Sequence, residues 1–208
     1  DAADAVGIVF KMEAIGDDVP ANYPVALQGK TIAGYAVAIE NVATGRQTLN
    51  TELLTALTET VAGMTNGTQT TGVLLTGLGD VAFKTTYEKW VGEHASASEN
   101  LSAWYIPTLS QLSAFMGTLF TMKDVPATGS EDFKNIPEFE FVNGKMFDRE
   151  TIATVNYASS TINNQGNVSG VRINVADGVV TNAQEAGISV KTALNQQALC
   201  RPMITIFK

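Results

Sequence analysis

The sequence predicts an α+β domain, in which a mixed or antiparallel sheet is flanked by two helices and carries long loops. Three observations predict it. Runs rich in β-branched and aromatic residues stand near both ends of the chain, two stretches have apolar residues at helical spacing, and Gly, Pro and Asn divide the second half into short pieces. A chain of 208 residues, 45% of them hydrophobic, can bury one core. We therefore expect a single domain over residues 1–208, which a longer exported protein could carry as its C-terminal part.

The predicted strands lie toward the two ends of the chain. Residues 6–12, "VGIVFKM", form one β-rich run, and residues 31–42 form a second after a loop that holds two prolines. In the second half we expect strands within residues 154–161 and 170–181, and a closing strand in residues 199–207, "LCRPMITIF". These runs would supply the sheet.

Two stretches have the spacing of amphipathic helices. They are residues 49–64 and residues 80–94, and the polar segment between them, residues 65–72 ("TNGTQTTG"), is expected to be a flexible turn. The apolar positions that define the helices are Leu53, Leu57 and Val61 in the first and Phe83, Tyr87, Trp90 and Val91 in the second.

Two turn-forming stretches divide the middle of the chain. In residues 104–112, "WYIPTLSQL", Pro107 keeps the preceding residues extended, and Thr108 followed by Gln111 has the spacing of a capping box at the start of a helix. In residues 138–147, "EFEFVNGKMF", the Asn-Gly pair predicts a hairpin with a type I′ turn. The buried side of the predicted helix is Leu112, Phe115, Met116 and Leu119.

Composition excludes several classes of function. The chain has 13 Lys and Arg against 21 Asp and Glu, a formal charge of -8 and a pI of about 4.6, so its surface should repel a phosphate backbone and we expect no nucleic-acid partner. One cysteine cannot form a disulfide within the chain, and the single histidine has no zinc-binding spacing. The sequence contains no run of about 18 apolar residues, so no membrane span is predicted.

One glycine pattern raises the possibility of a nucleotide-binding enzyme. Gly77, Gly79 and Ala82 match G-x-G-x-x-A between an apolar run and a helix, but the dinucleotide fingerprint also needs a βαβ unit with an acidic residue at the end of its second strand. About 20 residues on, the chain is polar and precedes a strand that ends in Pro. We expect a tight turn here and keep the enzyme as the less favoured alternative.

The remaining reactive residues each have a structural interpretation. We expect His94 to end a helix, where the macrodipole favours it, and Cys200 to be buried as a small hydrophobic residue. A group of acids could supply a carboxylate pair or a calcium site, but no EF-hand spacing orders them, so no metal is predicted. They are Asp17, Asp18, Glu131, Asp132, Glu138 and Glu140.

Short motifs in a fixed order resemble a known bacterial family. They are "GIVF" at 7–10, "GYAVAIENV" at 34–42, "WYIPTLSQL" at 104–112, "YASST" at 157–161, "ADG" at 176–178 and "CRPMITIF" at 200–207. Together they resemble the C-type-lectin-like domains of bacterial surface proteins, of the DUF1566 and major-paralogous-domain type, which are related to the formylglycine-generating-enzyme fold. The resemblance covers residues 7–207. It implies a C-type-lectin-like fold whose two ends lie in neighbouring strands and whose long loops between residues 161 and 200 form one exposed surface.

The departures from the family pattern bear on activity. Ala158 stands where the family usually has Trp, and Cys200 stands where Val usually precedes the Arg-Pro pair. A single cysteine cannot supply the catalytic cysteines of the enzymatic branch, and the calcium-lectin tripeptides Glu-Pro-Asn and Gln-Pro-Asp are absent. The resemblance therefore implies the scaffold without an enzyme, a cofactor or a calcium-dependent sugar site.

The expected function is a noncatalytic ligand-binding or adhesion module of an exported bacterial surface protein, such as an adhesin, a lipoprotein or a fimbrial tip. Its partner would be a glycan or a protein on a host or neighbouring cell, bound outside the cell by hydrogen-bonding loops on a rigid sheet. The alternative is a structural or receptor-binding protein of a phage virion or fibre, which a retroelement could diversify. The candidate ligand-binding residues are Asn163, Asn164, Gln165, Asn182, Gln184 and Gln196.

Overall fold

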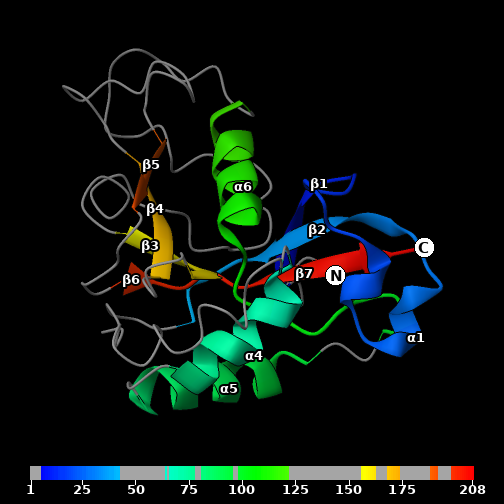
Figure 1. Cartoon of the computed structure of the whole chain (residues 1–208), viewed down its shortest axis with the longest axis horizontal. Helices are drawn as coiled ribbons and strands as arrows, with labels where there is room; N and C mark the ends of the chain where they lie inside the picture. Colours follow the sequence, from blue (N-terminus) through cyan, green and yellow to red (C-terminus); the bar gives the residue numbers. More distant parts are fainter. Residues whose placement is uncertain are drawn as a thin grey trace.

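The computed structural model is a mixed α+β structure with largely antiparallel sheets and several helices, as predicted (Figure 1). It describes residues 6–42, 64, 66–77, 81–95, 98–121, 156–162, 168–173, 188–191 and 198–208. The predicted helix at 49–64, apart from its last residue, and the predicted hairpin at 138–147 lie outside the described residues. No helix in the described ranges is long and apolar enough to cross a membrane.

The first sheet joins the two ends of the chain. It contains β1 (Gly7–Lys11), β2 (Ile32–Ala38) and β7 (Met203–Phe207) in the order β1-β2-β7, and both pairings are antiparallel. All three strands were predicted from their β-branched and aromatic content. The two ends of the chain share this sheet but do not lie in neighbouring strands as expected, because β2 stands between β1 and β7 and pairs with both.

The second sheet is built from the later part of the chain. It contains β3 (Asn156–Ile162), β4 (Val168–Ile173), β5 (Ile188–Lys191) and β6 (Ala198–Leu199) in the order β5-β4-β3-β6. Its pairings are antiparallel except that between β3 and β6, which is parallel. The predicted strand at 154–161 corresponds to β3, and the first part of the predicted strand at 170–181 corresponds to β4, which begins two residues earlier; residues 174–181 lie outside the described residues.

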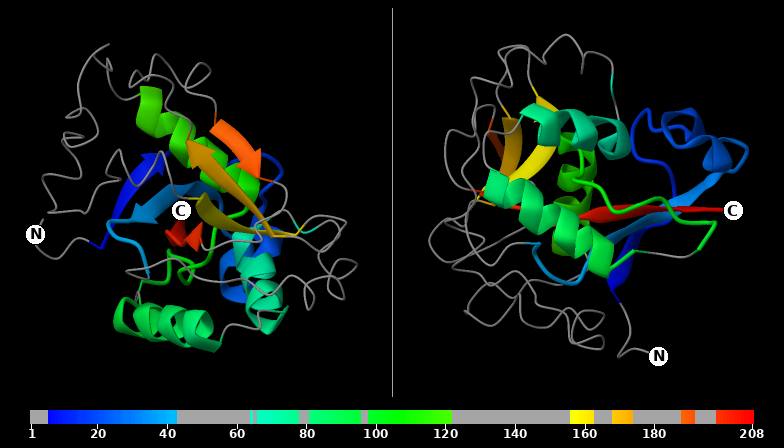
Figure 2. Two further views of the ribbon diagram at one scale, coloured as in Figure 1. Left: turned by 90° about the vertical axis from the view of Figure 1, so that its left-hand side faces the viewer. Right: turned by 90° about the horizontal axis from the view of Figure 1, so that it is seen from below.

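Alternating side chains give the first sheet two buried faces. One face packs against α6 (Leu109–Thr121), and the other packs against α5 (Val81–Glu93) and the extended segment around Trp104. Figure 2 shows the two helices on opposite sides of the sheet. The α6 side contains Tyr35, Val37, Met203, Phe207, Leu112 and Phe115, and the α5 side contains Ala36, Ala38, Ile204, Phe83, Trp90 and Trp104. Two short elements, the 3-10 turn η2 (Pro20–Asn22) and α1 (Val25–Gln28), lie between β1 and β2.

The predicted turn at residues 65–72 is wrong, because most of this segment forms the first part of α4 (Gly67–Gly77). Asn66 begins the helix by accepting a 2.6 Å hydrogen bond at its side-chain oxygen from the Thr68 backbone N-H. Thr70 and Thr71 are buried, and the Thr71 hydroxyl donates to the Ile106 carbonyl while accepting from the Ile106 N-H at 2.8 Å. The helix thus buries a polar face by hydrogen bonding, which the polar composition could not indicate.

The predicted capping box at the start of α6 is confirmed. The Thr108 backbone N-H donates to Gln111 Oε1 at 3.0 Å, and the Gln111 backbone N-H donates to Thr108 Oγ1 at 3.3 Å. The residues before Pro107 are extended, and Tyr105 forms an antiparallel bridge with Met203 at the edge of β7. The corner therefore places α6 against one face of the first sheet.

Two glycines of α4 provide a matched test of this packing. A methyl group added at Gly67 would collide with the Tyr105 ring and lie 2.6 Å from the Ile106 carbonyl oxygen, whereas one added at Gly72 would meet nothing within 4 Å. We expect Gly67→Ala to lower the free energy of unfolding by about 2 kcal/mol or more, and Gly72→Ala to leave it unchanged or raise it by up to about 1 kcal/mol. Chemical denaturation followed by circular dichroism measures both. Equal effects would contradict the close approach of α4 to the 105–106 segment.

Candidate functional site

The most densely connected polar site is centred on Asp18, in the segment between β1 and β2. Its side chain is only 3% exposed, and it accepts hydrogen bonds from three groups at short range: Tyr23 Oη at 2.6 Å, Tyr35 Oη at 2.7 Å and Asn66 Nδ2 at 2.7 Å. Gln111 Nε2 adds a longer contact at 3.5 Å. A buried carboxylate costs free energy unless donors surround it, so these contacts are what make its position possible.

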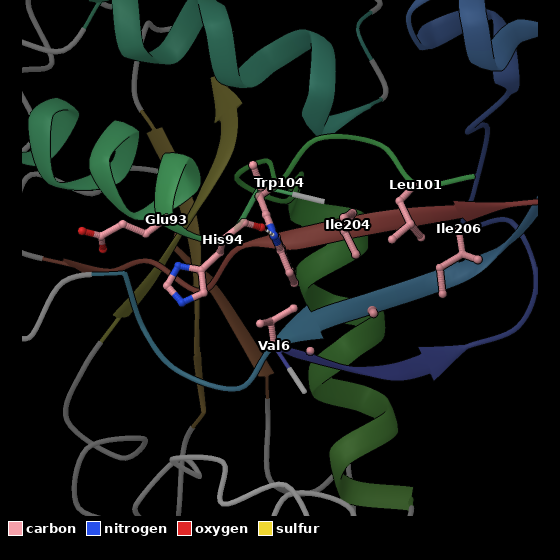
Figure 3. Close-up of a pocket in the computed structure, with 10 residues that line it drawn as sticks. Val6, Glu93, His94, Leu101, Trp104, Ile204 and Ile206 are labelled. Atoms are coloured by element: carbon pink, nitrogen blue, oxygen red, sulfur yellow. Dashed lines mark hydrogen bonds between the residues drawn. The ribbon is translucent and has the colours of Figure 1, made fainter. Parts of the chain in front are cut away.

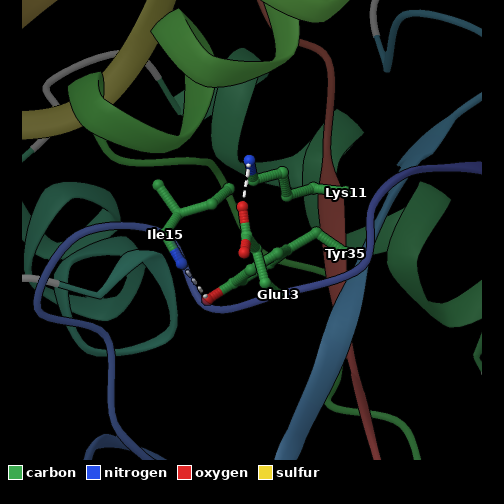
Figure 4. A network of polar contacts seen from close by, with 4 residues as sticks. All are labelled: Lys11, Glu13, Ile15 and Tyr35. Atoms are coloured by element: carbon green, nitrogen blue, oxygen red, sulfur yellow. Dashed lines mark hydrogen bonds and ion pairs between the residues drawn. The ribbon is translucent and has the colours of Figure 1, made fainter.

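A second layer of hydroxyl groups connects this site to the closing strand. Tyr23 and Tyr105 each bond the Thr205 hydroxyl at 2.8 Å, and Gln111 donates to the Tyr105 hydroxyl at 3.1 Å. Figure 4 shows the neighbouring contact in which the Ile15 backbone N-H donates to Tyr35 Oη at 3.2 Å. The same view shows an exposed ion pair between Lys11 and Glu13 at 2.6 Å, on the strand end nearby.

The network has a structural rather than a catalytic geometry. Burial is the main cause that raises the pKa of the phenols of Tyr23, Tyr35 and Tyr105 above their ordinary value, and the Asp18 charge adds to it. These phenols therefore remain neutral donors at physiological pH. Their hydroxyl groups are already engaged with Asp18, Thr205 or Gln111, and so the site is a set of fixed donors around one carboxylate.

A second polar contact set lies where the chain leaves β2 and returns toward β7. The Arg201 side chain is buried, and it donates from Nε to Asn41 Oδ1 at 2.9 Å and from NH1 to the Ala38 carbonyl at 3.1 Å. Backbone bonds from Val42 to the Cys200 carbonyl and from Ala38 to the Pro202 carbonyl join the same two segments. Burial lowers the Arg201 pKa to about 10, so the guanidinium keeps its charge at neutral pH.

The expectation for Cys200 is confirmed. Its side chain is fully buried, and burial raises the pKa of the thiol to about 12. A thiol with this pKa carries almost no thiolate at neutral pH, and the thiolate is the nucleophilic form. Cys200 therefore acts as a small core residue.

His94 directly follows the last residue of α5, at the helix end where it was predicted, and borders a pocket (Figure 3). Its Nδ1 lies 2.8 Å from the Trp90 carbonyl, and its ring stacks on the Trp90 ring with centroids 4.2 Å apart. The pocket has a volume of about 430 Å³ and lies on the α5 side of the first sheet. It is lined by Val6, Gly7, Ala36, Glu93, His94, Ala95, Leu101, Trp104, Ile204 and Ile206.

The predicted acidic group divides in the structure. Asp18 is buried in its network and Asp17 is exposed, while Glu131, Asp132, Glu138 and Glu140 lie outside the described residues. Among the residues that the structure places, no three His, Cys, Asp or Glu side chains come close enough to hold a metal ion. The donors around Asp18 are hydroxyl and amide N-H groups that point their hydrogens at its carboxylate. This arrangement stabilises the negative charge of Asp18 itself and does not suit a bound cation.

The glycine pattern lacks the context of a dinucleotide site. Residues 73–77, the apolar run before the glycines, form the end of α4 instead of a strand, and α5 then begins at Val81. The fingerprint needs a strand that leads through the glycines into a helix. Its strand is replaced here by a helix: Gly77 is the last residue of α4 and Ala82 lies in the first turn of α5, while Gly79 lies outside the described residues.

The six candidate ligand-binding residues all lie outside the described residues. The structure does place the strand ends that flank them. Asn163, Asn164 and Gln165 follow Ile162 and precede Val168, which pair with each other at one end of the second sheet. Two further candidates, Asn182 and Gln184, stand between Ile173 and Ile188, and Ile173 and Ile188 pair with each other at the opposite end of this sheet. The last candidate, Gln196, precedes Ala198. Ala198 pairs with Asn156, also at the opposite end.

Comparison of the chain with protein-family models, with curated proteins and with solved structures gives no match.

Sequence reasoning missed both the Asp18 network and the pocket. The only local signal for Asp18 was a pair of adjacent acids followed by Pro and Tyr, and apart from Tyr23, 5 residues away, its partners come from positions 17 to 93 residues away. For the pocket, the alternation in residues 203–207 did signal two different faces, with Ile204 and Ile206 on one of them. Nothing local indicated that Trp104 would lie over that face.

Replacement of Asp18 tests whether the network holds the fold together. Tyr23 and Tyr35 donate to Oδ2 of Asp18 and Asn66 donates to Oδ1. Asp18→Asn replaces one of these oxygens with an N-H₂ group, which sets a donor against a donor whichever oxygen is replaced, so we expect the free energy of unfolding to fall by about 2–4 kcal/mol. The matched control is Asp17→Asn, which makes the same change of charge at an exposed neighbouring position and should cost no more than about 0.5 kcal/mol. Urea denaturation measures both values. A cost for Asp18→Asn as small as that of the control would show that the network is not required.

The buried tyrosines predict instability in alkali. Burial raises the pKa of Tyr23, Tyr35, Tyr87 and Tyr105, so above about pH 10 the unfolded chain releases phenolic protons that the folded chain keeps. The contribution of these phenols to the free energy of unfolding should therefore be constant below that pH and fall progressively above it. Absorbance at the tyrosinate band, with urea denaturation at each pH, measures both effects. Ionisation of these four phenols near pH 10 without unfolding would contradict their burial.

Proposed function

We propose that this chain is a noncatalytic ligand-binding module of an exported bacterial surface protein, built on a C-type-lectin-like scaffold. Its ligand would be a glycan or a protein on another cell, bound through the Asn- and Gln-rich segments between residues 161 and 200. The observation that carries the proposal is the pairing of β2 with β7, which joins the two ends of the chain in one sheet. The resemblance of the sequence motifs implies that the two ends of the domain meet in one sheet, and the β1-β2-β7 sheet supports this, although β2 separates the two end strands.

The chemistry of the described residues supports binding rather than catalysis. The acid, the thiol and the guanidinium that are buried in the described ranges each serve packing: Asp18 is surrounded by donors, Cys200 has a raised pKa, and Arg201 bonds the Ala38 carbonyl. Such contacts make a rigid framework. A rigid framework lowers the entropic cost of ordering the loops that bind a ligand.

The strand ends divide the candidate ligand-binding residues into two groups. Asn163, Asn164 and Gln165 are flanked by one end of the second sheet, and Asn182, Gln184 and Gln196 are flanked by the opposite end. Amide side chains offer both donors and acceptors, which suits the hydroxyl groups of a glycan and the backbone of a protein. Since one ligand of modest size would contact one end, the two groups should be separable by mutation.

The first test is a screen of the purified chain on glycan and extracellular-matrix arrays, with calcium and with a chelator. We expect a reproducible ligand whose binding does not depend on calcium. One of the two triple variants, N163A/N164A/Q165A or N182A/Q184A/Q196A, should weaken that binding at least about tenfold, since each lost hydrogen bond costs about 1 kcal/mol. Titration calorimetry measures the affinities.

The control makes the same kind of change elsewhere. Gln28→Ala and Asn100→Ala remove exposed amides outside the 161–200 segments and should leave the affinity unchanged. If both triple variants bind like the parent protein, the assignment of the site is wrong. Silence on both arrays, together with a trimer or a filament in sedimentation, would favour the structural or receptor-binding protein of a phage virion or fibre.

A further inference from the structure

We propose that the pocket beside Trp104 is a second binding site, for a small ring-containing alcohol or amine. This site, called here the Trp104 pocket, is defined by the lining residues given above. It lies on the α5 side of the β1-β2-β7 sheet (Figure 3), whereas the strands that flank the candidate segments between residues 161 and 200 belong to the second sheet. The inference therefore does not rest on the proposed function.

The size and lining of the Trp104 pocket suit a small apolar body. Its volume of about 430 Å³ falls within the range of pockets that hold small molecules. Most of its wall is aliphatic or aromatic. Ile204 and Ile206 project from β7 on the same face, Leu101 faces them from the segment that borders β7, and Trp104 contributes an indole ring.

The aromatic wall is held in place before any ligand binds. Trp104 Nε1 donates a 2.8 Å hydrogen bond to the His94 carbonyl, and the Trp104 ring meets the Trp90 ring edge to face at 5.3 Å. Gly7 makes room for it, because a methyl group on Gly7 would lie 2.9 Å from Trp104 Cη2. A wall fixed by three independent contacts costs little further ordering when a ligand arrives.

The polar groups at the pocket select the chemistry of the ligand. The Trp90 carbonyl can only accept, so His94 Nδ1 carries the proton in that 2.8 Å contact. In the neutral ring, Nε2 is then left as an acceptor at the edge of the ring that faces away from the Trp90 carbonyl. Glu93 is paired with Lys89 at 3.7 Å, and its carboxylate points away from the other lining residues (Figure 3). No Lys or Arg is among the lining residues, and the net charge of -8 disfavours an anion. These features together fit a ring that bears a hydroxyl or an amino group, and they exclude a carboxylate.

A series of ligands with one ring and different polar groups tests this assignment. The probes are 2-phenylethanol, 2-phenylethylamine, 3-phenylpropionate and ethylbenzene, added to the full chain at pH 8 while ¹H–¹⁵N spectra are recorded. The chain has only two tryptophans, so the two indole N-H signals report on Trp90 and Trp104, and Trp90→Phe assigns them. We expect the alcohol and the amine to shift the Trp104 signal in a saturable manner and the carboxylate to bind at least tenfold more weakly. Absence of a saturable shift with the alcohol and the amine, or equal binding of the carboxylate, would overturn the proposal.

Two variants connect the binding to particular atoms. His94→Phe keeps a ring that can stack on Trp90 but removes the Nε2 acceptor, so the alcohol and the amine should bind about tenfold more weakly while ethylbenzene is unaffected. Ile206→Phe fills part of the pocket from a half-buried position and should weaken all four probes. Val25→Ala, at an exposed residue that does not line the pocket, is the control.

Thermal unfolding of each variant separates loss of the site from loss of the fold. If His94→Phe is folded and binds the alcohol as tightly as the parent protein, the role of Nε2 is wrong. If Ile206→Phe is folded and leaves every affinity unchanged, the probes bind elsewhere and the pocket is not their site. The triple variants at 161–200 should bind the probes normally, which makes failure of this site distinguishable from failure of the proposed function.

Discussion

A carboxylate can be stable in the protein interior only if hydrogen-bond donors surround it, and Asp18 places this constraint on the whole first half of the fold. Its donors come from η2 and its flank, from β2 and from the residue that begins α4, so the positions of these segments are linked through one side chain. Removing a single donor leaves a buried charge less well solvated, and that cost is larger than the gain from any one of these bonds. The network thus specifies one arrangement of loops that have little regular structure of their own.

The closing strand carries two different kinds of chemistry on its two faces. Thr205 points toward the α6 side, where its hydroxyl joins the tyrosines around Asp18, while Ile204 and Ile206 point toward the α5 side and line the Trp104 pocket. Side chains alternate along a strand, so this separation follows directly from the sequence "MITIF". The strand is also fixed along its edge by bonds between Ser102 and Thr205 and between Tyr105 and Met203. A strand held on its edge and on both faces provides a firm base for the pocket.

The extent to which the sequence predicts this structure depends on how local each cause is. The strands β1, β2 and β7, helix α5 and the capping box of Thr108 and Gln111 follow from spacing and local chemistry, and the structure has all of them. Helix α4 was missed because its threonines are buried by bonds to Ile106 and Ser160, which lie 35 and 90 residues away along the chain. The Asp18 network was missed for the same reason. No local pattern reports which distant donors will surround an acid, and so buried polar contacts were the part that the sequence could not predict.

The position of Arg201 shows how this core can be kept while the segments proposed to bind a ligand change. The side chain bonds Ala38 and Asn41 at the point where the chain leaves the first sheet, and Cys200 and Pro202 bond the same segment through their carbonyl groups. The exit and the return of the chain are therefore fixed to each other by contacts that do not involve residues 161–197. The entropic cost of a loop grows only slowly with its length, so substitutions or insertions between fixed ends cost little stability. This buried arginine keeps its charge at neutral pH, and it donates hydrogen bonds to a backbone carbonyl and to an amide side chain. These contacts stabilise the fold without using the segments that we propose bind a ligand.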